Sequence, residues 1–447
     1  MSARPGTNPR SPQWRAVLTL TLASLAWPVQ AQTALPADGG EAPLLPVVAS
    51  PQVELAPGTP LGAPLPQEMP STQPTPQQPL LADLAPGLMA KVLVRAGDLL
   101  SDGSTFAPKN DFTGYLPLNA HEGYLMVGHE IRWGKDALAG RLTRLLLRDN
   151  EMVAGQVWAS GMHNPCAGTV TPWKTVLTCE EYPHDNFPGD DGEARRENYL
   201  KRRLSPGHPL ASWGWVYEVN ALGPTPAGQT RRLTALGRFS HESAVVVGER
   251  EVYLTEDYDP GFLYKFVASK PRDLSEGKLY AYQRKEARWI PIIDPLNAHQ
   301  AAETAGATKF VRLEDVQMGP DRALYIAETG HPKWKDPYGR VLRLNLQTSR
   351  MSVFAQGDGV LMAQPDNLSF DSKGNMYVCE DQYEDNIAKF GPNELLRRDR
   401  RGRWARLAAF PKGAEPSGPT WSPDGKVLFL SVLWGDRSGI LSIRGIN

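Results

Sequence analysis

The feature that most constrains the fold of this chain is a series of short apolar runs that recur at similar intervals. Five runs end in an acid and the sixth in a valine: Glu130, Glu180, Glu256, Glu328, Glu380 and Val432. Successive ends lie 50, 76, 72, 52 and 52 residues apart. Turn residues such as Gly319-Pro320-Asp321 separate alternating apolar residues within the copies, a pattern typical of β-hairpins. Hairpin repeats of roughly 40 to 50 residues indicate a β-propeller. Six copies therefore predict an all-β fold, a six-bladed β-propeller over residues 91–447.

A second set of positions recurs fourteen residues before these ends: Leu116, Cys166, Glu242, Glu314, Asp366 and Gly418. The innermost strand of each propeller blade points its end at a central channel, so acids that share one register are expected to converge there. A single acid could cap a strand or pair with a surface lysine, but five acids in register favour a shared site. Clustered carboxylates repel one another and need cations, and oxygen-rich sites suit hard metals such as calcium.

The first 90 residues are expected to lie outside the propeller. Residues 1–31 combine three arginines, an apolar run and small residues near Ala31, as a secretory signal peptide does. Residues 32–90 are predicted to be a disordered Pro-rich linker, because Leu35 to Pro86 holds thirteen prolines and no aromatic residue, Lys or Arg. No later stretch has the roughly twenty apolar residues that a membrane-spanning helix needs. We therefore expect an exported monomer, periplasmic or extracellular, with no stable membrane insertion.

Charge and cysteine content narrow the functional classes. The 48 Lys and Arg residues nearly balance the 49 Asp and Glu residues, so we expect no nucleic-acid partner, which would need a basic field. The cysteines Cys166, Cys179 and Cys379 contain no C-x-x-C pair and match no zinc spacing. Arg312 lies two residues before the recurring acid Glu314. Its guanidinium could neutralise a metal-binding carboxylate or bind an anionic substrate through two hydrogen bonds.

Several motifs resemble, in the same order along the chain, those of the PhoX-type alkaline phosphatases. They are Gly128-His129-Glu130, Thr178-Cys179-Glu180-Glu181, Gly237-Arg238-Phe239-Ser240-His241-Glu242, Leu263-Tyr264-Lys265-Phe266-Val267, Arg312-Leu313-Glu314-Asp315 and Gly418-Pro419-Thr420-Trp421-Ser422-Pro423-Asp424-Gly425. The similarity spans most of the body, from about Leu93 to Val432. The chain departs from the family pattern at Gly128, where the family has Asn, and at Leu313, where it has Pro.

The resemblance implies a propeller whose channel holds Fe(III) and Ca2+ and which hydrolyses small phosphate monoesters. By analogy Cys179 would be a thiolate ligand that bridges two irons, Glu242 and Glu314 would be iron ligands, and Arg312 would bind the phosphate. Glu130 and Glu180 match acids near the calcium ions. The repeat register alone adds four further metal-site candidates: Glu256, Asp257, Glu328 and Glu380. Iron suits the cysteine and calcium suits the remaining oxygens, as ligand softness requires.

Two other functions are compatible with a metal-holding propeller. One is a calcium-dependent lactonase or esterase, in which Asn367 beside Asp366 would suit an axial calcium site. That reading leaves Cys179 without a role. The other is a non-catalytic propeller that binds a ligand or partner and keeps its metals for structure. Iron in the purified protein favours the phosphatase, and iron without turnover favours the binding protein.

Overall fold

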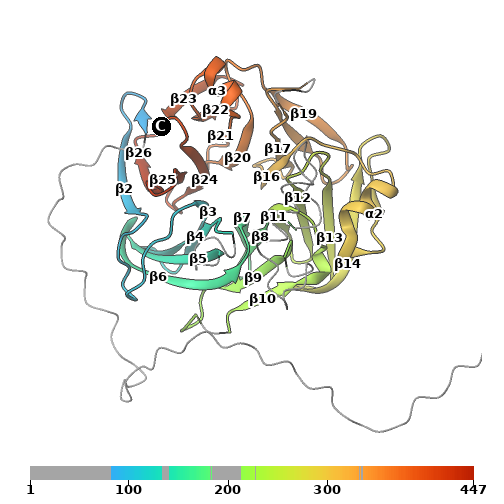
Figure 1. Ribbon diagram of the computed structural model, residues 1–447, viewed down its shortest axis with the longest axis horizontal. Helices are drawn as coiled ribbons and strands as arrows, with labels where there is room; N and C mark the ends of the chain where they lie inside the picture. The colour runs from blue at the N-terminus through green and yellow to red at the C-terminus, as the bar shows by residue number, and fades with distance from the viewer. Residues whose placement is uncertain are drawn as a thin grey trace, which may run out of the picture. The chain divides into compact units, whose positions relative to one another are not determined.

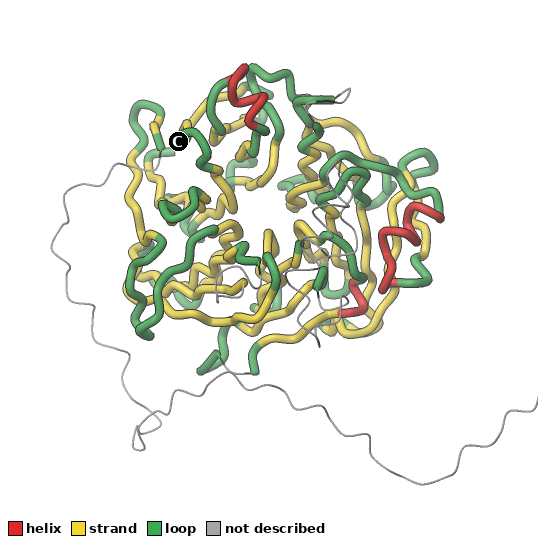
Figure 2. The backbone as a smooth tube through the Cα atoms, in the orientation of Figure 1, coloured by secondary structure: helices red, strands yellow, loops and turns green. Residues whose placement is uncertain are grey.

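The computed structural model describes residues 82–132, 140–181, 183, 213–226, 228–331, 333 and 336–446. The predicted signal peptide and residues 32–81 of the predicted linker lie outside these residues. The described residues fall within one compact unit, Pro64–Asn447. They form six antiparallel sheets of four or five strands each. In Figures 1 and 2 the sheets stand as blades in a ring, which confirms the predicted six-bladed β-propeller.

The blades follow one another along the chain. The first contains β3 (Asn110–Pro117), β4 (Glu122–His129), β5 (Gly140–Arg148) and β6 (Glu151–Met162). The second contains β7 (Pro165–Val170), β8 (Thr175–Glu180), β9 (Val216–Asn220) and β10 (Thr230–Leu233). The third contains β11 (His241–Val247), β12 (Glu251–Glu256), β13 (Leu263–Lys270), β14 (Asp273–Gln283) and β15 (Arg288–Pro291).

The fourth to sixth blades are built in the same way. The fourth contains β16 (Leu313–Met318), β17 (Leu324–Glu328), β18 (Arg340–Leu344) and β19 (Met351–Gln356). The fifth contains β20 (Pro365–Phe370), β21 (Met376–Glu380), β22 (Glu394–Arg398) and β23 (Trp404–Ala409). The sixth contains β24 (Glu415–Trp421), β25 (Val427–Leu433) and β26 (Gly439–Arg444). Short helices connect strands: η2 (Thr234–Leu236), η3 (Pro295–Asn297), α2 (Ala298–Thr304) and α3 (Glu384–Phe390).

The N-terminal strands complete the last two blades. β1 (Asp83–Leu84) pairs with β23, and β2 (Met89–Arg95) pairs with β26. Residues near 90 are thereby tied to the C-terminal strand β26, and β2 becomes the fourth strand of the sixth sheet. Residues 82–90 therefore belong to the propeller, and the predicted linker boundary at residue 90 is too late. The sequence pattern missed them because both strands pair with partners more than three hundred residues away.

Six apolar clusters hold neighbouring blades together, one at each interface around the ring. Strand residues alternate between the two faces of a sheet, so each sheet contributes one face to each of two clusters. The innermost strands β3, β7, β11, β16, β20 and β24 contact one another in that cyclic order. Within the described residues, no helix has both the length and the apolar character needed to cross a membrane.

Candidate metal centre

The innermost strand of every blade has a register shift, as at a β-bulge, close to the channel. Bulges bend a strand and re-aim its side chains, and they are common beside active sites. In five blades the residue at this shift is an acid or a cysteine, and all five are buried: Asp111, Cys166, Glu242, Glu314 and Asp366. The bulges therefore bring chemically similar side chains from five blades to one end of the channel.

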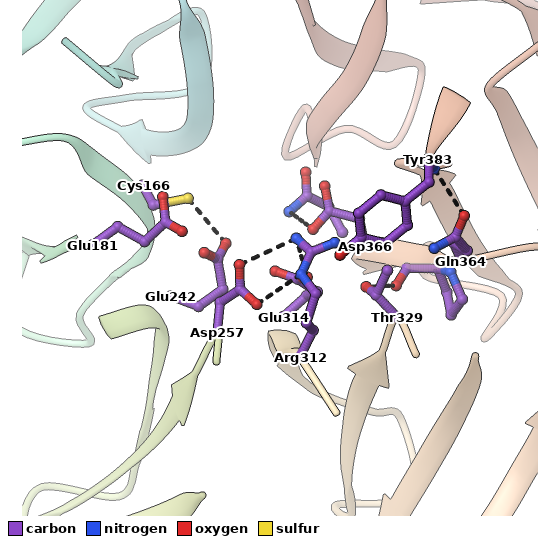
Figure 3. Close-up of polar contacts among 12 residues, drawn as sticks. Cys166, Glu181, Glu242, Asp257, Arg312, Glu314, Thr329, Gln364, Asp366 and Tyr383 are labelled. Carbon is purple, nitrogen blue, oxygen red and sulfur yellow. Dashed lines mark hydrogen bonds and ion pairs between the residues drawn. The ribbon is translucent and has the colours of Figure 1, made fainter. Parts of the chain in front are cut away.

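The ligand atoms of these residues lie close enough to share metal ions. Four groups have ligand atoms within 4.8 Å of one another: Asp111 with Cys166 and Glu242, Glu130 with Cys166 and Glu181, Glu181 with Glu242 and Asp257, and Glu242 with Glu314 and Asp366. The groups overlap through Cys166, Glu181 and Glu242, so they form one continuous cluster. Figure 3 shows part of this cluster, with Cys166, Glu242 and Glu314 contributed by three different blades.

Cys166 is central to the cluster. Its Sγ lies 2.7 Å from Oε1 of Glu130, 3.0 Å from Oε1 of Glu242 and 3.2 Å from Oδ2 of Asp111. Burial and the neighbouring carboxylates raise the pKa of the Cys166 thiol well above its usual value. A metal ion reverses this effect, because a coordinated thiol is deprotonated outright.

In four of the six blades an acid directly follows the second strand and adds a second row to the cluster. Glu130, Glu181, Asp257 and Asp381 each come directly after that strand ends. Their backbone N–H groups donate to the carbonyls of the residues that precede the innermost strands: Lys109, Asn164, Ser240 and Gln364. The same backbone hydrogen bond in these four blades thus holds the second row of acids beside the first.

Burial and mutual repulsion make this cluster unfavourable without cations. Burial, and after it the neighbouring carboxylates, raises the pKa of Glu242 well above its usual range. Burial is also the largest cause of the raised pKa values of Asp111, Glu181 and Asp366. Buried ionised carboxylates are costly unless they pair with cations or coordinate metals. Since the donor set combines one thiol with many carboxylate oxygens, it fits a centre of several metal ions.

Arg312 is a cation at the edge of the cluster. Its Nε and Nη2 donate to the two carboxylate oxygens of Asp257 at 2.9 and 3.1 Å, and Nη2 lies 2.8 Å from Oε1 of Glu314. The guanidinium carbon is 5.4 Å from the centre of the Tyr383 ring. The Arg312 side chain remains 19% exposed, so an anion that enters the channel can reach it.

The structure brings together five of the residues predicted from the sequence: Glu130, Glu242, Asp257, Arg312 and Glu314.

It does not bring Cys179 to them, and the cysteine that lies in the cluster is Cys166. Cys179 is fully buried in the apolar cluster between the second and third blades, with neighbours such as Val216 and Phe239. Cys179 lies within β8 and packs between the blades, whereas Glu181 follows the end of the strand and reaches the cluster. Cys379 lies in the corresponding apolar cluster between the fifth and sixth blades.

The remaining predicted acids are each the last residue of the second strand of a blade, one position before the residue that follows the strand: Glu180, Glu256, Glu328 and Glu380. All four accept backbone N–H groups inside their blades. Glu180, for example, binds the N–H groups of His163, Gly214 and Trp215. Glu256 also contacts His299 at 2.8 Å. These acids hold the loops of the channel in place, and none belongs to a group that could hold a metal among the described residues.

Sequence reasoning missed four members of the cluster: Asp111, Cys166, Glu181 and Asp366. Cys166 and Asp366 share the register of Glu242 and Glu314, which was the signal that could have found them. Asp111 could not be found by fixed spacing, because the first hairpin is longer. The paired residues Asn110 and His129 are 19 positions apart, whereas Pro165 and Glu180 are 15 apart.

Glu328 is expected to position Arg312. Its Oε1 accepts the N–H of Val311 at 3.0 Å, its Oε2 binds Nε of Arg340 at 2.6 Å, and the next N–H, of Thr329, donates to the Arg312 carbonyl at 2.9 Å. Arg312 has a φ of +55°, a strained conformation that the surroundings must maintain. Replacing Glu328 with alanine should raise KM for a phosphate ester by about tenfold. Without Glu328 the Arg312 guanidinium would be displaced from the position in which it is expected to bind the phosphate.

A matched control lies at the other end of the same hairpin. Asp321 also binds an arginine, Arg343, at 2.6 Å and accepts a backbone N–H, from Ala323. Replacing Asp321 with alanine should leave KM unchanged. An equal rise in KM in both variants would mean that loosening the blade, and not moving Arg312, causes the effect.

The stability of the metal-depleted protein is expected to fall as pH rises. Burial raises the pKa of Glu180 and of Glu380 to about 8, above the usual 4.5. Between these values the unfolded chain has lost protons that the folded chain keeps, so a rise in pH favours unfolding. The buried acids of the cluster act in the same direction. The melting temperature of chelator-treated protein should drop by several degrees from pH 5 to pH 8, and a rise over this interval would contradict the assignment.

Comparison with known proteins gives the family. The sequence model of the family described as alkaline phosphatase PhoX matches residues 141–434. Pseudomonas fluorescens PhoX in complex with vanadate, a transition state analogue, has a similar fold, with a TM-score of 0.67 and 20% identity over 81% of this chain and 96% of that chain. The pyranose dehydrogenase PQQ domain from Coprinopsis cinerea is less similar, with a TM-score of 0.42 and 11% identity over 83% of this chain and 98% of its own. Among curated proteins, no sequence matches this one. The family match extends over well more than half of the chain, and the chain belongs to the alkaline phosphatase PhoX family.

Proposed function

We propose that this member of the family is an exported, metal-dependent enzyme that hydrolyses small phosphate monoesters at the channel cluster. The observation that carries the proposal is the meeting of Cys166 with carboxylates from several blades beside Arg312. A cluster of this size can hold several metal ions, and the Arg312 guanidinium at its edge suits a phosphate group. Export rests on the signal sequence alone, and the monomeric state and the absence of nucleic-acid partners are proposed from composition.

The donor types support iron and calcium as the metals. Cys166 favours iron, because thiolates prefer softer metals than calcium. Glu242 belongs both to the group of Cys166 and to the oxygen-only group of Glu314 and Asp366, so it would be a ligand in either group. The groups made of carboxylates alone, including Glu181 with Asp257, suit calcium or Fe(III).

Each protein group then has a defined task. When bound, the metal ions would offset the negative charge that gathers on the phosphoryl oxygens. Arg312 binds the phosphate with its planar N–H donors, and Asp257 fixes the orientation of the guanidinium through two hydrogen bonds. Since Glu242 and Glu314 are 2% and 3% exposed, the cluster excludes most water, which strengthens these electrostatic interactions.

The lactonase alternative has less support. It needs the amide oxygen of Asn367 as a calcium ligand, but that oxygen accepts hydrogen bonds from the Ser417 hydroxyl and the Gly418 N–H. The Asn367 side chain therefore links the fifth and sixth blades.

The test is an assay with p-nitrophenyl phosphate at alkaline pH, before and after treatment with a chelator. Turnover should be lost on chelation and restored by iron with calcium, but not by calcium alone. Hydrolysis of a lactone that needs only calcium, without phosphatase activity, would replace the proposal by the lactonase. Iron binding without turnover of either substrate would leave a binding protein.

A further inference from the structure

A groove of about 480 Å³ lies between the fourth and fifth blades, at the end of the hairpins opposite the metal centre. The turn that joins β16 to β17 contributes Pro320, and the turn that joins β20 to β21 contributes Lys373. Glu314 lies at the other end of β16, close to the channel cluster. The groove is therefore separate from the proposed catalytic site.

One wall of the groove is cationic. Lys373, Arg398 and Arg400 line it, and within the described part of the chain none of the three forms an ion pair. The two acids of the lining are already engaged: Asp321 pairs with Arg343 at 2.6 Å and Asp399 with Arg403 at 2.7 Å. Three positive charges therefore remain uncompensated in the groove.

The cation of Arg398 is held in place without being neutralised. Its guanidinium carbon lies 4.4 Å from the centre of the Phe354 ring and 5.9 Å from that of Trp404. Aromatic faces attract a cation but accept few of its hydrogen bonds, so the N–H donors remain available to an anion. The Arg400 stem lies beside Gly374, and Arg400 also lines the groove.

Aromatic rings also line the groove, and one of them, Phe354, lies against Arg398. Tyr325, Phe354 and Phe370 line the groove, and the Tyr325 ring centre lies 4.8 Å from that of Phe354 and 4.9 Å from that of Phe370. A flat apolar group can pack against these rings while an attached anion reaches the cations. We propose that this groove binds a small organic anion, in which a phosphate or carboxylate is attached to a flat apolar group.

The test uses 1-naphthylmethylphosphonate, whose carbon–phosphorus bond a phosphatase does not hydrolyse. Titration calorimetry with the metal-loaded protein measures its Kd. Replacing Arg400 with glutamate should weaken binding at least tenfold, because the new carboxylate repels the anion. Arg400 is exposed, so the variant is expected to fold. Its kcat with p-nitrophenyl phosphate should not change, since the channel is untouched.

The matched control is Arg401, which is also exposed, is the next residue of the same turn and does not line the groove. Replacing Arg401 with glutamate makes the same charge change and should alter the Kd less than twofold. Binding that weakens equally in both variants would reveal a general charge effect and overturn the proposal. Binding unchanged in the Arg400 variant would place the probe elsewhere, for instance in the channel, and would overturn it as well. Neither result depends on the catalytic activity of the protein.

Discussion

Replacing Cys166 with serine is expected to remove the iron and to lower phosphatase turnover by at least about a hundredfold. Replacing a residue that only hydrogen-bonds to a metal ligand typically lowers metal affinity or activity by roughly 10- to 100-fold. Cys166 lies at the centre of the cluster, so the expected loss is at least as large. Serine keeps the size of the side chain but offers a hydroxyl in place of the soft sulfur. Metal analysis of the purified variant, next to its activity, measures both effects.

Cys179 supplies the matched control. It is buried among apolar side chains and belongs to none of the metal-binding groups found among the described residues, so its replacement by alanine should leave iron content and turnover unchanged. The expected cost is a small loss of stability from the missing sulfur. If iron were lost from the Cys179 variant and kept in the Cys166 variant, the assignment of the thiol would be reversed.

Replacing Arg312 with alanine is expected to raise KM for a phosphate ester more than tenfold, about 1.4 kcal/mol or more of lost binding. The alanine removes the hydrogen-bond donors proposed for the phosphate and also leaves Asp257 and Glu314 without their cation. Replacement by lysine separates these effects, because lysine keeps the charge but cannot make two parallel hydrogen bonds. The lysine variant should therefore keep the fold and still bind the ester poorly.

Arg343 is the control for Arg312. It forms a similar two-nitrogen contact with Asp321, at 2.8 and 2.6 Å, but at the far end of the blade. Its replacement by alanine should leave KM unchanged. A normal KM in the Arg312 variants would remove that residue from the site.

The blade repeat could be predicted because each hairpin carries its own turn residues and alternating apolar residues. From these local signals we predicted six blades and the convergence of Glu242 and Glu314 at the central channel. The spacing failed where hairpins differ in length, as in the first blade, so Asp111 was missed. Closure by β2 was missed because it depends on a strand pair formed between distant segments.

The exact face of a side chain at the end of a strand is harder to predict. Glu180 and Glu181 are neighbours in sequence, yet the first binds backbone N–H groups within its blade and the second joins the cluster. If the register of a strand shifts by one residue, each of its side chains moves to the opposite face of the sheet. The motif that contains Cys179 does not reveal the register of its strand. The pairing within the same hairpin, with Pro165 opposite Glu180, places Cys166 beside the channel, in the register that Glu242 and Glu314 share.

The most direct test of the metal centre is X-ray absorption at the iron edge, on protein purified with its metals. Iron held by Cys166 should show a sulfur atom among its nearest neighbours, and this signal should vanish in the Cys166→Ser variant and persist in the Cys179→Ala variant. An iron signal with only oxygen or nitrogen neighbours in the unaltered protein would contradict the account, as would a protein that is active but contains no iron.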